Sequence, residues 1–167
     1  MEIDFLSVLF RWMHILPAII AVGATVFMRV ALVPALGELP DAERQRFHEA
    51  IRARWSKWVM GCITFLLISG FYNFFTLNAK YQFPKLYHPL FGIKVLLALA
   101  IFAIASILAG RSSTAQRVRK NPKPLLNLNI ALAVLLVCIS GVMRNITMNS
   151  PLKASTTPAA AAAPEQP

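Results

Sequence analysis

Residues 89–110 read PLFGIKVLLALAIFAIASILAG, a run whose only charged side chain is that of Lys94. A helix needs about 20 mostly apolar residues to cross the roughly 30 Å of hydrocarbon in a bilayer, so this run predicts a transmembrane helix. Three further stretches meet the same criterion, at 5–36, 59–77 and 125–147. The sequence therefore predicts an all-α integral membrane protein, a four-helix bundle with up-down topology.

The composition excludes an ordinary soluble enzyme. Of 167 residues, 57% are hydrophobic and 14% are charged, whereas a soluble domain has about 45–50% apolar and about 25% charged residues. Two cysteines are too few for a disulfide framework or a four-thiolate zinc site. Nucleotide-binding glycine loops and the common hydrolase motifs are also missing from the sequence.

The basic residues predict the orientation in the membrane. The formal net charge is +10, and most of the basic residues lie in the two loops that follow the first and third spans. They are Arg44, Arg46, Arg52, Arg54 and Lys57 in one loop and Arg111, Arg117, Arg119, Lys120 and Lys123 in the other. Positive residues stay cytoplasmic, so we expect both termini outside a bacterial inner membrane. The charge indicates contact with anionic lipid of the bilayer and argues against nucleic acid.

The first basic loop has a helical pattern of its own. Phe47, Ile51, Trp55 and Trp58 recur at helical spacing with arginines on the other faces, which predicts a short cytoplasmic amphipathic helix leading into the second span. Beyond the last span the chain is rich in Pro and Ala, and we expect it to be disordered. The predicted organisation is a membrane domain at 1–149 and a tail at 150–167.

Ionisable side chains gather toward the outer ends of three predicted spans. Arg11 and His14 lie in the first, Lys94 in the third and Arg144 in the fourth. Such groups are costly inside a membrane and are usually functional. At 1.5 Å per residue, His14 lies about 14 Å from the outer end, Lys94 about 8 Å and Arg144 about 5 Å. Their similar depth predicts one shared site in the outer half of the bundle.

Three interpretations of His14 remain open at this point: an imidazole bonded to another helix, an axial ligand of haem iron, and a copper ligand. A four-helix bundle can hold a haem b between its helices with an imidazole on the iron. His88 and Lys94 are the candidates for the second axial ligand. Arg11 and Arg144 are shallow enough to bind the haem propionates.

Copper is the alternative cofactor. His14 and His88 would bind it together with the outer methionines Met13, Met143 and Met148, because imidazole and thioether ligands suit copper. The protein would then bind or transport copper. Under a further alternative, the polar cluster only holds helices together in a structural membrane subunit.

Several short motifs resemble a known superfamily over about 145 residues. In the first span they are Arg11-Trp12-Met13-His14-Ile15-Leu16, Gly23, Phe27 and Val33-Pro34-Ala35-Leu36; later come Trp58, Ser69-Gly70 and Phe91-Gly92-Ile93-Lys94-Val95-Leu96. This order resembles the copper resistance protein D (CopD) family. Similar patterns occur in the HemJ-type membrane protoporphyrinogen oxidases and in the membrane part of bacterial urate oxidases.

The resemblance implies a four-helix membrane module. CopD-like proteins are associated with copper uptake, and HemJ-type proteins are b-haem proteins that oxidise protoporphyrinogen IX. By position, His14 matches the first-helix histidine and Lys94 the third-helix lysine of the HemJ pattern. The chain departs from that pattern where Met28-Arg29-Val30-Ala31-Leu32-Val33-Pro34 replaces an aromatic-rich stretch, and no histidine follows Lys94. These departures argue against the oxidase activity.

The sequence thus favours an inner-membrane b-type haem protein for electron transfer or redox chemistry. The candidate site residues are His14, His88, Lys94, Arg11 and Arg144. Its candidate partners besides the bilayer are a second copy of the chain and a redox protein.

Overall fold

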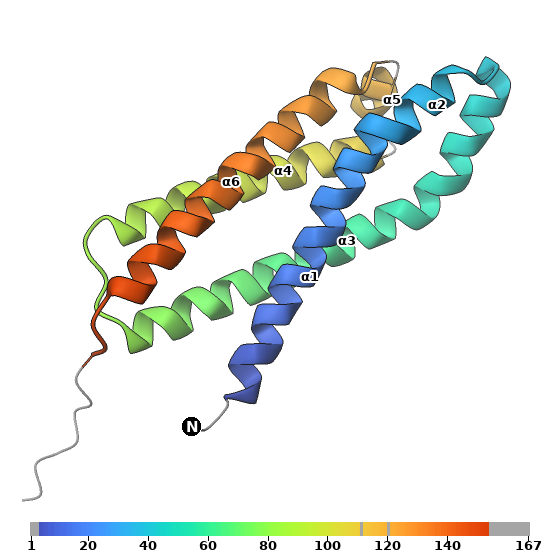
Figure 1. The fold of residues 1–167 in the computed structure, drawn as a ribbon. Helices are drawn as coiled ribbons and strands as arrows, with labels where there is room; N and C mark the ends of the chain where they lie inside the picture. Colours follow the sequence, from blue (N-terminus) through green and yellow to red (C-terminus); the bar gives the residue numbers. More distant parts are fainter. Residues whose placement is uncertain (1–3, 111, 120, 154–167) are drawn as a thin grey trace, which may run out of the picture.

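The computed structural model describes residues 4–110, 112–119 and 121–153, and they are helical over most of their length (Figure 1). The elements are α1 (Phe5–Phe27), a π-helical turn η1 (Met28–Leu32), α2 (Val33–Gly37), α3 (Asp41–Lys80), α4 (Tyr87–Ala109), α5 (Ser113–Arg119) and α6 (Lys123–Asn149). Within the described residues, four stretches are long and apolar enough to cross a membrane: Phe5–Gly37, Arg54–Lys80, Tyr87–Ala109 and Lys123–Asn149. The predicted all-α class and the four membrane-length helices are confirmed.

Apolar side chains cover the outside of these helices. Leu16, Phe75 and Leu96 keep 59%, 63% and 68% of their surface exposed. A soluble helix buries one apolar stripe and turns a polar face outward, whereas helices that are apolar all round suit hydrocarbon. The exposed surface therefore supports a multi-pass membrane protein.

The first membrane-length stretch is one helical run that two prolines modify. Pro17 lies buried within α1; it has no N–H, so it leaves the carbonyl of Met13 without its usual helical partner. Further along, Val33 donates its N–H to the carbonyl of Met28, five residues back. Pro34 follows directly and cannot donate, so the turn before it widens instead of continuing as a regular α-helix.

The amphipathic helix expected before the second span is not a separate element. Residues 41–58 form the first part of α3, which continues without interruption to Lys80 and is about 60 Å long at 1.5 Å per residue. The reason is local, because no glycine or proline lies between Asp41 and Met60 to end the helix. Phe47, Ile51 and Trp58 are exposed on this segment.

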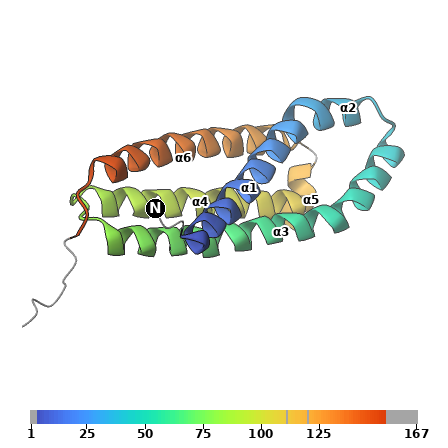
Figure 2. The ribbon, with the colours of Figure 1, turned by 60° about the horizontal axis from the view of Figure 1, so that its bottom comes forward.

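Helices α3, α4 and α6 lie side by side, and α1 crosses them (Figures 1 and 2). Contacts between α1 and α3 run from one end of the pair to the middle: Lys80 with Asp4, Asn73 with the carbonyl of Phe10, Tyr72 with Phe10 and Ser69 with His14. Each step forward along α1 meets an earlier residue of α3. The two helices therefore run in opposite directions.

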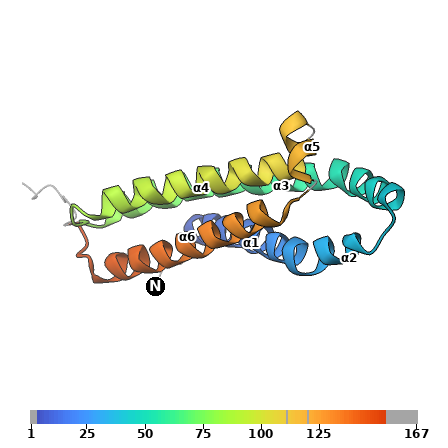
Figure 3. The ribbon, with the colours of Figure 1, turned by 90° about the horizontal axis from the view of Figure 1, so that it is seen from above.

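Beyond α6, the chain turns back to the segment that joins α3 and α4 (Figure 3). Gln82 donates its N–H to the carbonyl of Pro151 at 2.9 Å, and Lys153 donates its N–H to the carbonyl of Lys80 at 3.0 Å. The first four residues of the predicted tail are thus held at this end of the molecule. The remainder, 154–167, lies outside the described residues.

Candidate functional site

The imidazole of His14 packs against α3. Its Nδ1 lies 3.0 Å from the hydroxyl of Ser69, and the ring sits over Gly70. Ser69 is completely buried, while His14 is half-buried on α1. The contact places the one polar ring of the first helix against the one Ser-Gly pair of α3.

The hydrogen bonds around Ser69 determine which nitrogen of His14 carries the proton. A serine hydroxyl has one hydrogen to donate, and the Ser69 hydroxyl donates it to the carbonyl of Phe65 at 2.5 Å. Toward His14 it can therefore only accept, so Nδ1 bears the hydrogen and donates it. The neutral ring is then left with a bare lone pair on Nε2, the form in which an imidazole binds a metal.

Gly70 makes room for this ring. A Cβ atom built on Gly70 would lie 3.2 Å from Cε1 and 3.6 Å from Nδ1 of His14. The first distance is tighter than ordinary van der Waals contact, so any larger residue would displace the imidazole. Glycine at this position sets how closely α1 and α3 approach.

Lys94 on α4 is the second candidate residue. It is half-buried on a membrane-length helix. Within the described part of the chain its ammonium group has no hydrogen bond or ion pair. All seven acidic residues lie outside the four membrane-length stretches, so none of these helices offers Lys94 a carboxylate.

The other candidate residues lie nearer the surface. His88 is exposed, and its ring stands edge-on to those of Phe74 and Tyr87, with centroids 6.2 Å and 6.1 Å away. Arg11 on α1 and Arg144 on α6 are both exposed. The structure thus joins His14 to Ser69 and Gly70, whereas the ring contacts of His88 belong to an aromatic cluster at the start of α4.

The end of the bundle beside this site is held by Asp4. Its carboxylate accepts hydrogen bonds from the hydroxyl of Ser7 at 2.6 Å and from the N–H of Ser7 at 3.2 Å, and Lys80 on α3 approaches to 3.3 Å. These contacts, those of Ser7 foremost, lower the pKa of Asp4 below its ordinary value of 3.8. Asp4 therefore caps α1 and ties it to the end of α3.

Sequence reasoning did not identify Ser69 and Gly70 as part of the site. A signal was present, because the Ser-Gly pair lies about as far from the end of its span as His14 does from the start of the first. Antiparallel neighbours bring residues at equal depth together, so the hydroxyl was available to the imidazole. Ser-Gly pairs also occur in membrane helices simply because small residues pack closely, so the pair alone does not indicate a site.

Among the described residues, no group of three or more His, Cys, Asp or Glu side chains is arranged to hold a metal ion. A haem requires less from the protein, since the macrocycle supplies four ligands and one or two side chains supply the rest. His14, through Nε2, has the chemistry of such an axial ligand. A scan of family models and searches of curated proteins and of solved structures found nothing that matches this chain.

Proposed function

We propose that this is a b-type haem protein of a bacterial inner membrane that serves electron transfer or redox chemistry, with the haem in the outer half of the helical bundle. His14 would hold the haem iron through Nε2. The observation that carries the proposal is the hydrogen bond from Nδ1 to the buried hydroxyl of Ser69. Histidines that ligate metals usually donate their other ring N–H to a fixed acceptor, which sets the tautomer and the ring orientation.

Lys94 is the preferred second ligand, because it is half-buried on a membrane-length helix and because no carboxylate of these helices competes for it. It would ligate only as the neutral amine. His88 remains the other candidate. Arg11 and Arg144 would hold the propionates, since both lie within about two turns of the helix ends at this side and present exposed guanidinium groups.

A bound haem would supply reversible one-electron chemistry at iron. The chain's own residues supply the surroundings. Ser69 orients the imidazole, Gly70 admits it between α1 and α3, and the apolar helices exclude water. Exclusion of water and the identity of the axial ligands are the features by which a protein sets a haem potential.

The proposed orientation has four alternating spans with both termini outside. The basic residues in the α2–α3 region and in the α4–α6 connection then face the cytoplasm, as positive residues do. On this arrangement the exposed Phe47 and Ile51 lie against the cytoplasmic lipid surface, which explains apolar residues among so many arginines.

The test is haem content in two matched variants. His14→Ala removes the proposed ligand, and His48→Ala removes a histidine of the cytoplasmic part of α3. Both proteins are purified in detergent after expression with the haem precursor supplied, and haem and chain are quantified. We expect near one haem per chain in wild type and in His48→Ala, and a loss of more than tenfold in His14→Ala.

Equal haem in all three proteins would show that His14 is not the ligand. Metal analysis of the same samples covers the copper alternative. Copper that depends on His14, in a protein without haem, would replace the haem proposal with the copper one.

A further inference from the structure

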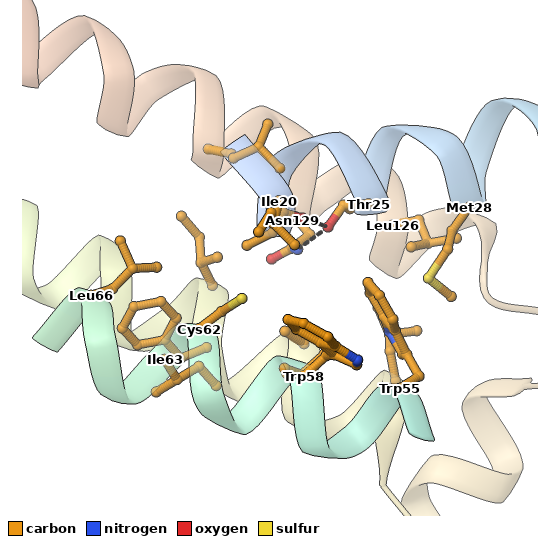
Figure 4. Close-up of a pocket in the computed structure, with 18 residues that line it drawn as sticks. Ile20, Thr25, Met28, Trp55, Trp58, Cys62, Ile63, Leu66, Leu126 and Asn129 are labelled. Atoms are coloured by element: carbon orange, nitrogen blue, oxygen red, sulfur yellow. Dashed lines mark hydrogen bonds between the residues drawn. The ribbon is translucent and has the colours of Figure 1, made fainter. Parts of the chain in front are cut away.

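A second group of polar side chains lies deeper in the bundle. Its member on α1, Thr25, is about 16 Å along the helix from His14, at 1.5 Å per residue. A cavity of about 60 Å³ opens between α1, α3, α4 and α6 (Figure 4). One water molecule needs about 10–15 Å³, so the cavity is several times larger than a single water site. Its residues include Thr25, Trp55, Trp58, Cys62 and Asn129.

The side chain of Asn129 provides an unsatisfied group in this cavity. Only 3% of Asn129 is exposed, and its Oδ1 is buried with no hydrogen-bond partner within the described part of the chain. A buried polar atom without a hydrogen bond destabilises the fold unless a partner satisfies it. Figure 4 shows the amide between Thr25 and the side chains of α3.

The orientation of the amide follows from Thr25. The Thr25 hydroxyl donates its single hydrogen to the carbonyl of Ala21 at 2.8 Å, so toward Asn129 it can only accept. The atom 3.4 Å away must therefore be Nδ2. This leaves Oδ1 facing the cavity. Because Oδ1 is a hydrogen-bond acceptor, only a ligand with a hydrogen-bond donor can pair with it.

The walls of the cavity indicate what kind of donor fits. Trp55 and Trp58 provide flat aromatic surfaces on α3, and Cys62 is buried beside them. Ile20 and Trp58, which also line the cavity, are 43% and 64% exposed and lie on helices of membrane length. A ligand would therefore arrive through the hydrocarbon of the bilayer.

We propose that this cavity binds the hydroxylated ring of a membrane-soluble hydroquinone, with one ring hydroxyl donating to Oδ1 of Asn129. The hydroxyl end enters the cavity, and the rest of the ring packs against the lining side chains of Trp58 and Ile20. The oxidised quinone has a carbonyl where the hydroquinone has a hydroxyl. Its carbonyl oxygen and Oδ1 of Asn129 are both acceptors, so no hydrogen bond would form between them. The site therefore selects the reduced form. This inference does not depend on haem at His14.

The experiment uses Cys62 as a reporter in a Cys138→Ser background, because Cys138 is exposed and does not line the cavity. Alkylation of Cys62 by N-ethylmaleimide is followed without oxygen, with tetramethylhydroquinone or tetramethylbenzoquinone added. Both rings are fully substituted, so the thiol does not add to them. We expect the hydroquinone to slow alkylation at a concentration about tenfold lower than the quinone does, the preference typical of one good hydrogen bond.

Two variants and one control locate the preference for the hydroquinone. Asn129→Val should weaken hydroquinone binding about tenfold, to the level of the quinone. Asn145→Val, on the same helix outside the cavity, should change the affinity for neither compound. Thr25→Val keeps the shape of the cavity but removes the hydroxyl that orients the amide of Asn129. The amide can then turn to donate or to accept, so the hydroquinone and the quinone should bind with nearly equal affinity. The proposal is overturned if neither compound protects Cys62 in the parent protein, if the two protect equally, or if the preference survives Asn129→Val.

Discussion

At the residue scale, the central feature is one imidazole whose tautomer is set by its neighbours. The hydroxyl of Ser69 donates its hydrogen to the carbonyl of Phe65 in its own helix, so His14 must donate to that hydroxyl from Nδ1. A lysine ligand offers no comparable control, because the ammonium rotates freely and must first lose a proton. His14 is accordingly the residue on which the account depends.

Ser69→Ala should reduce haem affinity about 10–100-fold without removing the ligand itself, because groups that orient a metal ligand have effects of this size. The matched control is Ser140→Ala. Ser140 precedes a glycine in the same way and bonds the carbonyl of Leu136 at 2.7 Å. Haem titration of the two purified apoproteins measures the difference, and equal affinities would contradict the role given to Ser69.

Gly70→Ala should also impair the site, because the new Cβ would lie 3.2 Å from Cε1 of His14 and force the ring to move. We expect haem affinity to fall by about tenfold, at the lower end of the range for changes that misorient a ligand. Gly141→Ala is the control, since a Cβ there meets nothing within 4 Å while the gain in helix propensity is the same. Equal haem affinities of the two variants in a haem titration would contradict this role of Gly70.

The residue scale is also where sequence reasoning was least complete. His14 and Lys94 stood out because charged or titratable groups are rare in membrane helices. Ser69 and Asn129 did not, since a hydroxyl or an amide in a span has many uses and its partner comes from another helix. Identifying those partners requires the rotation of each helix about its axis, which the hydropathy of the sequence does not specify.

At the element scale, the structure differs most from expectation in α3. Hydropathy divides residues 41–80 into a basic amphipathic part and an apolar span, whereas the backbone has no reason to break between them. The limits of the other long helices agree within a few residues with the predicted spans, because Pro, Gly and charged residues lie near their ends. Helix termination is thus predicted well where such signals exist and poorly where they do not.

The cap of α1 gives a pH dependence. Hydrogen bonds from Ser7, together with Lys80, lower the pKa of Asp4 below 3.8 in the folded protein. The carboxylate therefore contributes stability that is complete well above pH 3.8 and is lost as the pH falls through the lower, folded-state pKa. Asp4→Asn should lower the thermal unfolding midpoint at pH 7 by a small amount, and the gap from wild type should close toward pH 3. A gap of the same size at both pH values would contradict this role.

At the scale of the whole molecule, the sequence predicted the class and the number of membrane-length helices, because both depend on composition and length alone. It did not predict how the helices pack. The crossing of α1 depends on contacts such as Asn129 with Thr25 and Arg29 with Asn127, the latter at 2.6 Å. These pairs join residues about 100 positions apart, and no local pattern encodes them.

The proposed orientation can be tested by labelling single cysteines in a chain in which Cys62 and Cys138 are replaced by serine. A membrane-impermeant thiol reagent added to intact spheroplasts should label cysteines placed at Lys85 and Lys153 and should spare those placed at Glu38 and Ser112. Inverted vesicles should give the opposite pattern. Labelling of Glu38→Cys from outside would show that the basic loops face the wrong side.

The most direct test of the central claim is an oxidised-minus-reduced optical spectrum of the purified wild-type protein, with haem and metal quantified in the same sample. We expect a Soret band, sharp α and β bands on reduction, and close to one haem b per chain. A protein that stays colourless after reconstitution with haem would contradict it, and His14 would then be an imidazole that joins two helices.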